Sequence, residues 1–298
     1  MVKTPYGEAR RLAYFRVVTE QAAKFLPCDI TFLVDQILKV SAKMRGSLQS
    51  YKRTTGKMEN KNVCYNYLRF SSWLRFLKIE GDLVSKNANT VFFSTLESGE
   101  GFSLSTEEKL AYFIHLSSRV PKLREVLGML SNSRPLPSGK LRALGITEHS
   151  AESYSEWLVD LDLAAATRRD YGAYYLSAVG NEVKSDGETL EEACCTYASS
   201  ILGARVEPRQ DVSEDYAWRE IVKLAKDLSS HITSPVDPTL VAALPILLHL
   251  QIVLLKKRRT FLTREELIAL ARRASDSHKA TFTWDRAYET GYLKFRWR

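Results

Sequence analysis

A ten-residue pattern that occurs twice constrains the fold of this 298-residue chain more than any other feature. Residues 70–79 are FSSWLRFLKI, and residues 154–163 are YSEWLVDLDL. Both run aromatic, Ser, any residue, Trp, Leu, two variable residues, Leu, one variable residue, and Ile or Leu, which pairs Trp73 with Trp157. In each copy the aromatic residue, the Trp and the Leu residues recur at helical spacing. We therefore expect two helices that bury the same side.

The first copy lies in a predicted series of three helices and a β-hairpin. Apolar periodicity predicts helices at residues 7–26, 30–44 and 62–78. Two short β-prone segments follow at residues 79–85 and 90–95, and Lys86–Asn89 between them has the polar composition of a turn.

The second copy lies in a similar series. The sequence predicts helices at 104–118, 120–130, 140–145 and 148–162, then strands at 163–167 and 173–178 with Arg168, Arg169 and Asp170 at the hairpin tip. Ser94 lies 21 residues after Trp73, and Ser177 lies 20 residues after Trp157. Because the segments after both copies also match in length, the sequence predicts a duplicated module.

The remaining sequence predicts further helices and a terminal hairpin. Helices are expected at 190–203, 213–230, 238–258 and 261–275, with a boundary at SPVDP and a final hairpin from 281–286 and 292–297. We expect a first module with its preceding helix, a second module, a helical connector and a basic C-terminal region. Their predicted boundaries are 1–98, 99–186, 187–236 and 237–298.

The order of helices followed by a hairpin resembles the winged-helix superfamily, the helix-turn-helix variant with a two-stranded wing. The resemblance covers residues 28–180, and residues 237–298 could form a third, degenerate copy. It implies a mainly α fold with small β-hairpins: tandem winged-helix domains plus a C-terminal helical and hairpin region. It also implies DNA binding through the third helix of a module, although many such modules pair proteins instead. Successive modules also resemble the target-recognition portions of some restriction endonucleases and some archaeal regulators.

Positive charge gathers at both ends of the chain. Residues 1–80 hold 15 Lys/Arg and 6 Asp/Glu, a net of +9, and residues 255–298 hold 12 and 5, a net of +7. Since the whole chain carries +8, residues 81–254 carry −8. Two basic ends favour contact with a polyanion such as nucleic acid.

The helix at 62–78 is the strongest candidate for contact with double-stranded DNA. Asn pairs with adenine edges and Arg with guanine edges in the major groove, and nearby Lys and Arg neutralise phosphates. The predicted DNA-binding residues are Lys52, Arg53, Lys57, Lys61, Asn62, Tyr65, Asn66, Arg69, Ser72, Lys86, Arg168, Arg169, Lys256, Lys257, Arg258, Arg259, Lys294 and Arg296. The terminal hairpin also interleaves cations with aromatic residues, a composition suited to stacking on unpaired bases.

The helix at 148–162 differs by an acidic stripe. Glu148, Glu152, Glu156 and Asp160 recur every four residues, so they share one side of the helix. Phosphate would repel this stripe, and we do not expect it in a DNA groove. It predicts either an ordinary solvated face or a docking surface for a basic partner, the chain's own basic end or a second subunit.

No sequence motif establishes catalysis. The five histidines lack metal-ligand spacing, and neither a phosphate-binding Gly-rich loop nor a G-x-S-x-G motif occurs. Asp170, Glu182 and Lys184 fit the D…ExK series of metal-dependent nucleases, but the chemistry requires them on neighbouring strands. We therefore expect a DNA-binding protein without catalytic residues, metal or cofactor, acting in regulation, replication or defence. A protein-pairing scaffold is the alternative, and a nuclease a minor one.

Localisation is predicted from what the sequence lacks. The N-terminal residues have no apolar signal-peptide core, and the longest apolar run, 244–255, is interrupted by Pro245, His249 and Gln251. The four cysteines show neither zinc spacing nor a disulfide framework, which favours a reducing compartment. We expect a cytoplasmic protein, associated with the nucleoid if the source is prokaryotic.

Overall fold

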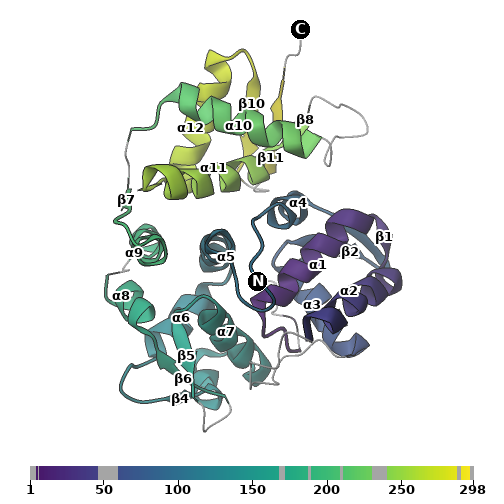
Figure 1. The fold of residues 1–298 in the computed structure, drawn as a ribbon, viewed down its shortest axis with the longest axis vertical. Coiled ribbons are helices and arrows are strands. Elements are labelled where there is room, and N and C mark those ends of the chain that lie inside the picture. The colour runs from purple at the N-terminus through teal and green to yellow at the C-terminus, as the bar shows by residue number, and fades with distance from the viewer. Residues whose placement is uncertain are drawn as a thin grey trace. The chain divides into compact units, whose positions relative to one another are not determined.

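The computed structural model divides into two compact units (Figure 1), Met1–Tyr197 and Ala198–Arg298. It describes residues 5, 7–45, 60–167, 172–186, 189–208, 211–229, 240–286 and 290–295. Most of these residues are helical, and the strands form small sheets of two or three, so the predicted mainly α fold with small hairpins is confirmed. The division into two units is coarser than the four predicted regions. The predicted boundaries of those regions stay predictions.

The first unit opens with three helices and a three-stranded sheet, which we call the first module. Its elements are α1 (Leu12–Phe25), β1 (Cys28–Asp29), α2 (Ile30–Arg45), α3 (Lys61–Trp73), β2 (Leu77–Glu80) and β3 (Leu83–Lys86). Strand β3 lies in the middle of the antiparallel sheet β1–β3–β2. Helix α3 begins where Asn60 Oδ1 accepts a hydrogen bond from the Val63 N–H at 3.0 Å, which satisfies one free donor of its first turn.

The prediction for the hairpin of this module was wrong in both strands. The turn lies at Gly81 and Asp82, inside the predicted first strand at 79–85, which therefore covers parts of both β2 and β3. The predicted second strand at 90–95 lies in helix α4 (Ala88–Ser94) and just after it. Asn87 and Thr90 form a capping box, in which each side chain accepts the backbone N–H of the other. This local cap starts a helix in a segment whose Val and Phe residues favour a strand by propensity alone.

The second module follows helix α5 (Thr106–Arg119) in the same unit. Its elements are α6 (Pro121–Met129), β4 (Leu136–Pro137), the 3₁₀-helix η2 (Ser138–Leu144), α7 (Glu148–Asp160), β5 (Ala164–Ala166) and β6 (Ala173–Leu176). Its sheet order is β4–β6–β5, so the last strand is again central. The predicted helices and hairpin are present here, and helix α8 (Ala178–Asp186), which the sequence analysis missed, follows them.

The second unit contains a third module with the same order of elements. Its elements are α10 (Glu214–Ser229), β8 (Leu240–Ala242), α11 (Ala243–Arg258), α12 (Arg264–Ser277), β10 (Thr281–Asp285) and β11 (Thr290–Lys294). The sheet order is β10–β11–β8, and the three helices pack with it (Figure 1). The unit begins within α9 (Leu190–Leu202) and includes a short parallel pair, β7 (Glu207–Pro208) with β9 (Thr260–Phe261).

The third helix of every module ends in the same backbone turn. Arg75, Asp162 and Lys279 have positive φ angles of 61°, 61° and 57°. In each case the N–H of the following residue donates to the carbonyl five residues earlier, at 2.7, 2.8 and 2.9 Å, which closes the helix end. These three residues therefore occupy equivalent positions.

This equivalence corrects the register taken from the repeated sequence pattern. Arg75 and Asp162 are 87 positions apart, whereas Trp73 and Trp157 are 84 apart. In the structural register Trp157 corresponds to Phe70, and Trp73 corresponds to Asp160. Accordingly Trp157 is fully buried, while Trp73, which was expected inside, lies partly exposed.

Aromatic side chains join the two modules of the first unit. The Trp157 ring centroid lies 6.0 Å from that of Phe70 on α3 and 5.7 Å from that of Phe15 on α1, both edge to face. Phe15 also packs edge to face on Tyr67 at 5.2 Å. Each such pair adds about 0.5–1.5 kcal/mol to the burial of apolar area. Helices α3 and α7 consequently share one core.

Candidate nucleic-acid interface

Helix α3 presents a polar side that carries no negative charge. Asn62, Asn66 and Arg69 are spaced four and three residues apart and so lie on one side of the helix. Asn62 and Arg69 are exposed and Asn66 is half-buried. Among the described residues none of these three side chains forms a hydrogen bond or an ion pair, and α3 contains no Asp or Glu. This side therefore offers unused donors and acceptors to an external partner.

Other predicted residues on or near α3 are less available. Lys61 is paired with Asp35 on α2, with 3.2 Å between Nζ and Oδ1. Tyr65 and Ser72 are half-buried and lie beside the polar side, on the same flank of it. Lys86 ends strand β3 instead of lying at the hairpin tip, because the turn lies at Gly81 and Asp82. The predicted turn at Lys86–Asn89 is thus wrong, while Lys86 still lies in the hairpin and its contact with DNA stays a prediction.

Six predicted contacts cannot be placed in the fold. They lie outside the described residues and stay predictions: Lys52, Arg53, Lys57, Arg168, Arg169 and Arg296.

In the second module the equivalent side of α7 is covered by residues 7–12, which we call the N-terminal strap. The Ala9 N–H donates to Ser153 Oγ at 3.2 Å, and Trp157 Nε1 donates to the Ala9 carbonyl at 2.6 Å. The Arg10 guanidinium forms an ion pair with Glu152. In the register set by Arg75 and Asp162, Ser153 corresponds to Asn66 of α3. Ser153 is buried under the strap, whereas Asn66 is only half-buried.

A buried ion pair fixes the end of the strap. Arg11 Nη2 lies 2.6 Å from Asp160 Oδ1, and the two side chains are only 6% and 2% exposed. Asp160 Oδ2 also accepts the Leu12 N–H at 2.7 Å. Burial and the nearby carboxyl of Glu156 raise the pKa of Asp160, Arg11 and the Leu12 N–H lower it, and together they bring it to about 6. Above that pH two ionised groups are therefore held together in the interior.

The acidic stripe of α7 is therefore not the solvated face that its spacing predicted. Asp160 and Glu156 are both buried as whole residues, and Glu156 accepts a hydrogen bond from the Tyr174 hydroxyl at 2.8 Å. Glu148 remains exposed and pairs with Arg142. Of the expected occupants, the chain's own basic N-terminal segment is present. The stripe is an internal contact and leaves no free surface for a second subunit at Glu156 and Asp160.

Glu8, His149 and Glu152 gather oxygen and nitrogen atoms in an arrangement that could hold a cation. Arg10 already lies among them, because its Nη2 is 2.9 Å from Glu8 Oε1 and also pairs with Glu152. The guanidinium supplies the positive charge that the carboxylates require. The cluster is therefore an ion-pair network of the strap.

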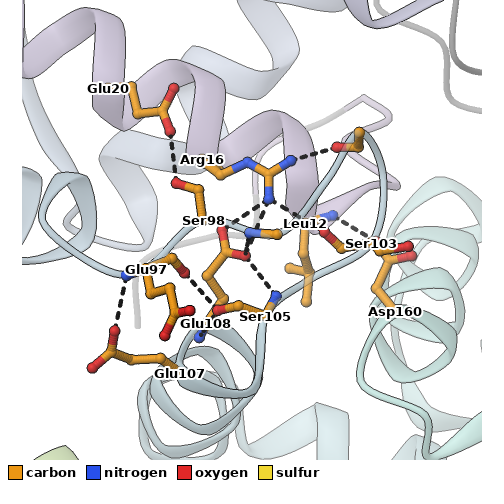
Figure 2. Close-up of polar contacts among 12 residues, drawn as sticks. Leu12, Arg16, Glu20, Glu97, Ser98, Ser103, Ser105, Glu107, Glu108 and Asp160 are labelled. Atoms are coloured by element: carbon orange, nitrogen blue, oxygen red, sulfur yellow. Dashed lines mark hydrogen bonds and ion pairs between the residues drawn. The ribbon is translucent and has the colours of Figure 1, made fainter.

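A second buried network holds the loop that precedes α5 (Figure 2). Arg16 Nη1 on α1 lies 3.1 Å from both carboxylate oxygens of Glu108, and Arg16 also donates to the carbonyls of Gly101 and Ser103. Glu108 in turn accepts the N–H groups of Gly99 and Ser105, both at 2.8 Å. The loop and the start of α5 are thereby tied to α1.

The basic run at the end of α11 lies in the second unit, where several of its charges have partners. Lys257 Nζ is 2.9 Å from Glu220 Oε1, and the Arg258 guanidinium lies 4.5 Å from the centroid of the Tyr216 ring. Arg259 ends the helix with a positive φ of 56° and donates to the Leu255 carbonyl. Lys256 is half-buried and Lys294 is exposed on β11. These residues are less free for phosphate contact than the sequence suggested.

The nuclease hypothesis finds no support in the described residues. Glu182 and Lys184 lie on helix α8, whereas the predicted chemistry required neighbouring strands. The Lys184 ammonium donates to the Leu130 carbonyl at 2.8 Å. Asp170 lies outside the described residues.

Comparison with known proteins leaves the family open. No family model matches the chain, and no curated protein does. Among solved structures, restriction endonuclease FokI is similar with a TM-score of 0.37 and 11% sequence identity, over 99% of this chain and 63% of the FokI chain. The chain thus spans less than two thirds of that neighbour, and a similarity this weak defines neither family nor function. None of the described helices is long and apolar enough to cross a membrane.

Proposed function

We propose that the three modules are winged helices and that the protein binds double-stranded DNA without cleaving it, with α3 as the helix that enters the major groove. The observation that carries the proposal is the polar side of α3, which has one positive and no negative charge. Its residues Asn62, Asn66 and Arg69 have no partner among the described residues. Asn is suited to bidentate pairing with adenine and Arg with guanine.

Phosphate contacts in this proposal come from residues that surround α3. Lys39 and Lys43 are exposed on α2, and Arg75 is exposed just after α3. The module also belongs to the N-terminal 80 residues that carry +9. Neutralisation of phosphates by such residues would dominate the affinity and make it dependent on salt.

The exposed cations Arg272 and Lys279 of the third module provide a second basic surface in the proposal. The second module would act as an internal support, because its equivalent helix face lies under the strap. The burial of Glu156 and Asp160 weighs against a scaffold that would dock its partner on the acidic stripe of α7. DNA binding by a chain whose four cysteines are free fits the cytoplasmic localisation expected from the sequence.

The proposal is tested by titrating duplex and single-stranded DNA with the whole chain at two salt concentrations. We expect duplex affinity that falls steeply with salt, and a loss of about 5- to 150-fold on Arg69→Ala, the equivalent of roughly 1–3 kcal/mol for a base-contacting Arg. Arg142→Ala is the matched control, because Arg142 is also exposed in the first unit but lies outside α3. Failure to bind any duplex at low salt would contradict the proposal.

A further inference from the structure

Gly7 of the strap approaches the Asn66 side chain more closely than any other residue type would allow. A Cβ placed on Gly7 would lie 2.5 Å from Asn66 Cγ, 2.5 Å from Oδ1 and 2.7 Å from Nδ2. All three amide atoms therefore face the Gly7 backbone. Gly7 itself is buried, and its φ of +134° is a conformation that side chains with a Cβ rarely adopt.

The strap is held on the second module while it touches the first. Within two to five residues of Gly7, its backbone bonds to Ser153 and Trp157, and Arg11 pairs with Asp160. The Arg11 N–H also donates to the Tyr67 hydroxyl on α3 at 2.7 Å. Gly7 consequently has little freedom to move away from Asn66.

An amide that contacts a fixed backbone loses rotamer freedom before any partner arrives. Bidentate pairing with adenine needs the Asn amide in one plane, and fixing that plane in advance removes part of the ordering cost of binding. Within the described part of the chain the Asn66 amide makes no hydrogen bond, so its polar edge is still available.

We propose that Gly7 is a positioning residue that orients the Asn66 amide for base recognition, and that the second module serves to anchor it. This inference rests on the proposed DNA binding and adds a source of sequence specificity to it. It also gives the acidic helix α7 a role: its carboxylates hold the arginines of the strap, and the strap holds Asn66.

The test begins by selecting a preferred site for the wild-type protein from a library of random duplexes. The preference for each base pair is then measured for wild type, Gly7→Ala, Asn66→Ala and the double variant. We expect Asn66→Ala to reduce the preference at one position by about 5- to 150-fold. Gly7→Ala should reduce the base preference at the same position. Because Gly7 is proposed to act through Asn66, the double variant should lose no more base preference than Asn66→Ala alone. Gly139→Ala is the control, because a Cβ at Gly139 meets no atom within 4 Å.

Ser153→Ala provides a milder second variant in case Gly7→Ala does not fold. It removes the acceptor of the Ala9 N–H, so it loosens the strap without touching Gly7 or α3. It should reduce the preference at the Asn66-dependent position, with an unchanged slope of affinity against salt. The inference is overturned if Gly7→Ala and Ser153→Ala both keep the wild-type base preference, or if the wild-type protein binds duplexes with no base preference. Either result leaves the proposed function standing. Absence of duplex binding overturns the proposed function itself.

Discussion

The guanidinium of Arg11 and the carboxylate of Asp160, 149 residues apart in sequence, lie 2.6 Å from each other in the interior of the first unit. Removing one partner of a buried pair leaves the other charge uncompensated, which costs about 3–5 kcal/mol. We therefore expect Asp160→Asn to lower the free energy of unfolding by at most that amount, because the burial that raises the pKa of Asp160 offsets part of the pairing. Urea denaturation of the whole chain, monitored by tryptophan fluorescence, measures it because Trp157 lies one turn before Asp160.

The neighbouring residue Asp162 offers a matched control for this prediction. It also pairs with a cation, Lys109, but its side chain is 51% exposed. Its positive φ of 61° is one that Asn tolerates well. An exposed pair contributes only about 0–1 kcal/mol, so Asp162→Asn should change stability little. Equal losses for both variants would show that the Arg11–Asp160 pair has no special importance.

The stability contributed by Asp160 should depend on pH in the acid range. Its pKa is raised by burial to about 6 in the folded protein, against an ordinary value of 3.8. The folded state therefore binds the proton more tightly than the unfolded state. The contribution of this bound proton to stability, which is distinct from the ion pair with Arg11, is fully present below pH 3.8 and is lost as pH rises through about 6. The difference in unfolding free energy between wild type and Asp160→Asn should accordingly narrow from pH 4.5 to pH 7.5, as denaturation across that range would show.

Local patterns in the sequence were sufficient for most helices and for the hairpin of the second module. The caps explain this success: Ser105 and Glu108 form a capping box at the start of α5, and Thr263 and Glu266 form one at the start of α12, each between residues only three apart in the sequence. The short first strand of each module was missed, because β1, β4 and β8 have only two or three residues. Strands this short exist through pairing with a distant hairpin and leave no period to detect.

The candidate site was predicted in part. The composition of α3 identified Asn62, Asn66 and Arg69, since polar residues at helical spacing on one side need no tertiary information. The covering of α7 by the strap could not be predicted in the same way. The four-residue spacing of its carboxylates is that of an ordinary solvent-exposed helix face, and only the tertiary fold brings Arg10 and Arg11 to them. The Gly7–Asn66 contact left no signal beyond a single glycine near the N-terminus.

Gly99 should tolerate no side chain, in contrast to Gly128. A Cβ on Gly99 would lie 2.2 Å from the Ser103 carbonyl oxygen and 2.7 Å from the Ser105 nitrogen, both backbone atoms of the loop held by Arg16 and Glu108. We expect Gly99→Ala to destabilise the first unit by more than about 2 kcal/mol, since backbone must move. Gly128 is exposed near the end of α6 with no atom within 4 Å, and Gly128→Ala should stabilise by up to about 1 kcal/mol. Thermal denaturation distinguishes them, and a stable Gly99→Ala would contradict the packed loop.

Lys257 should contribute less to DNA binding than its place in a basic run suggests. Its ammonium is 2.9 Å from Glu220, and the hydrogen bond to that carboxylate raises the pKa of Lys257. Lys257→Ala should therefore weaken duplex binding much less than Arg69→Ala. Glu220→Gln removes the competing charge and should free Lys257 for phosphate, which steepens the dependence of log affinity on log salt by about 0.9. Glu265→Gln is the control, an exposed acidic residue of α12 with no ion pair among the described residues. A loss on Lys257→Ala as large as that on Arg69→Ala would show that DNA displaces Glu220 from the ammonium.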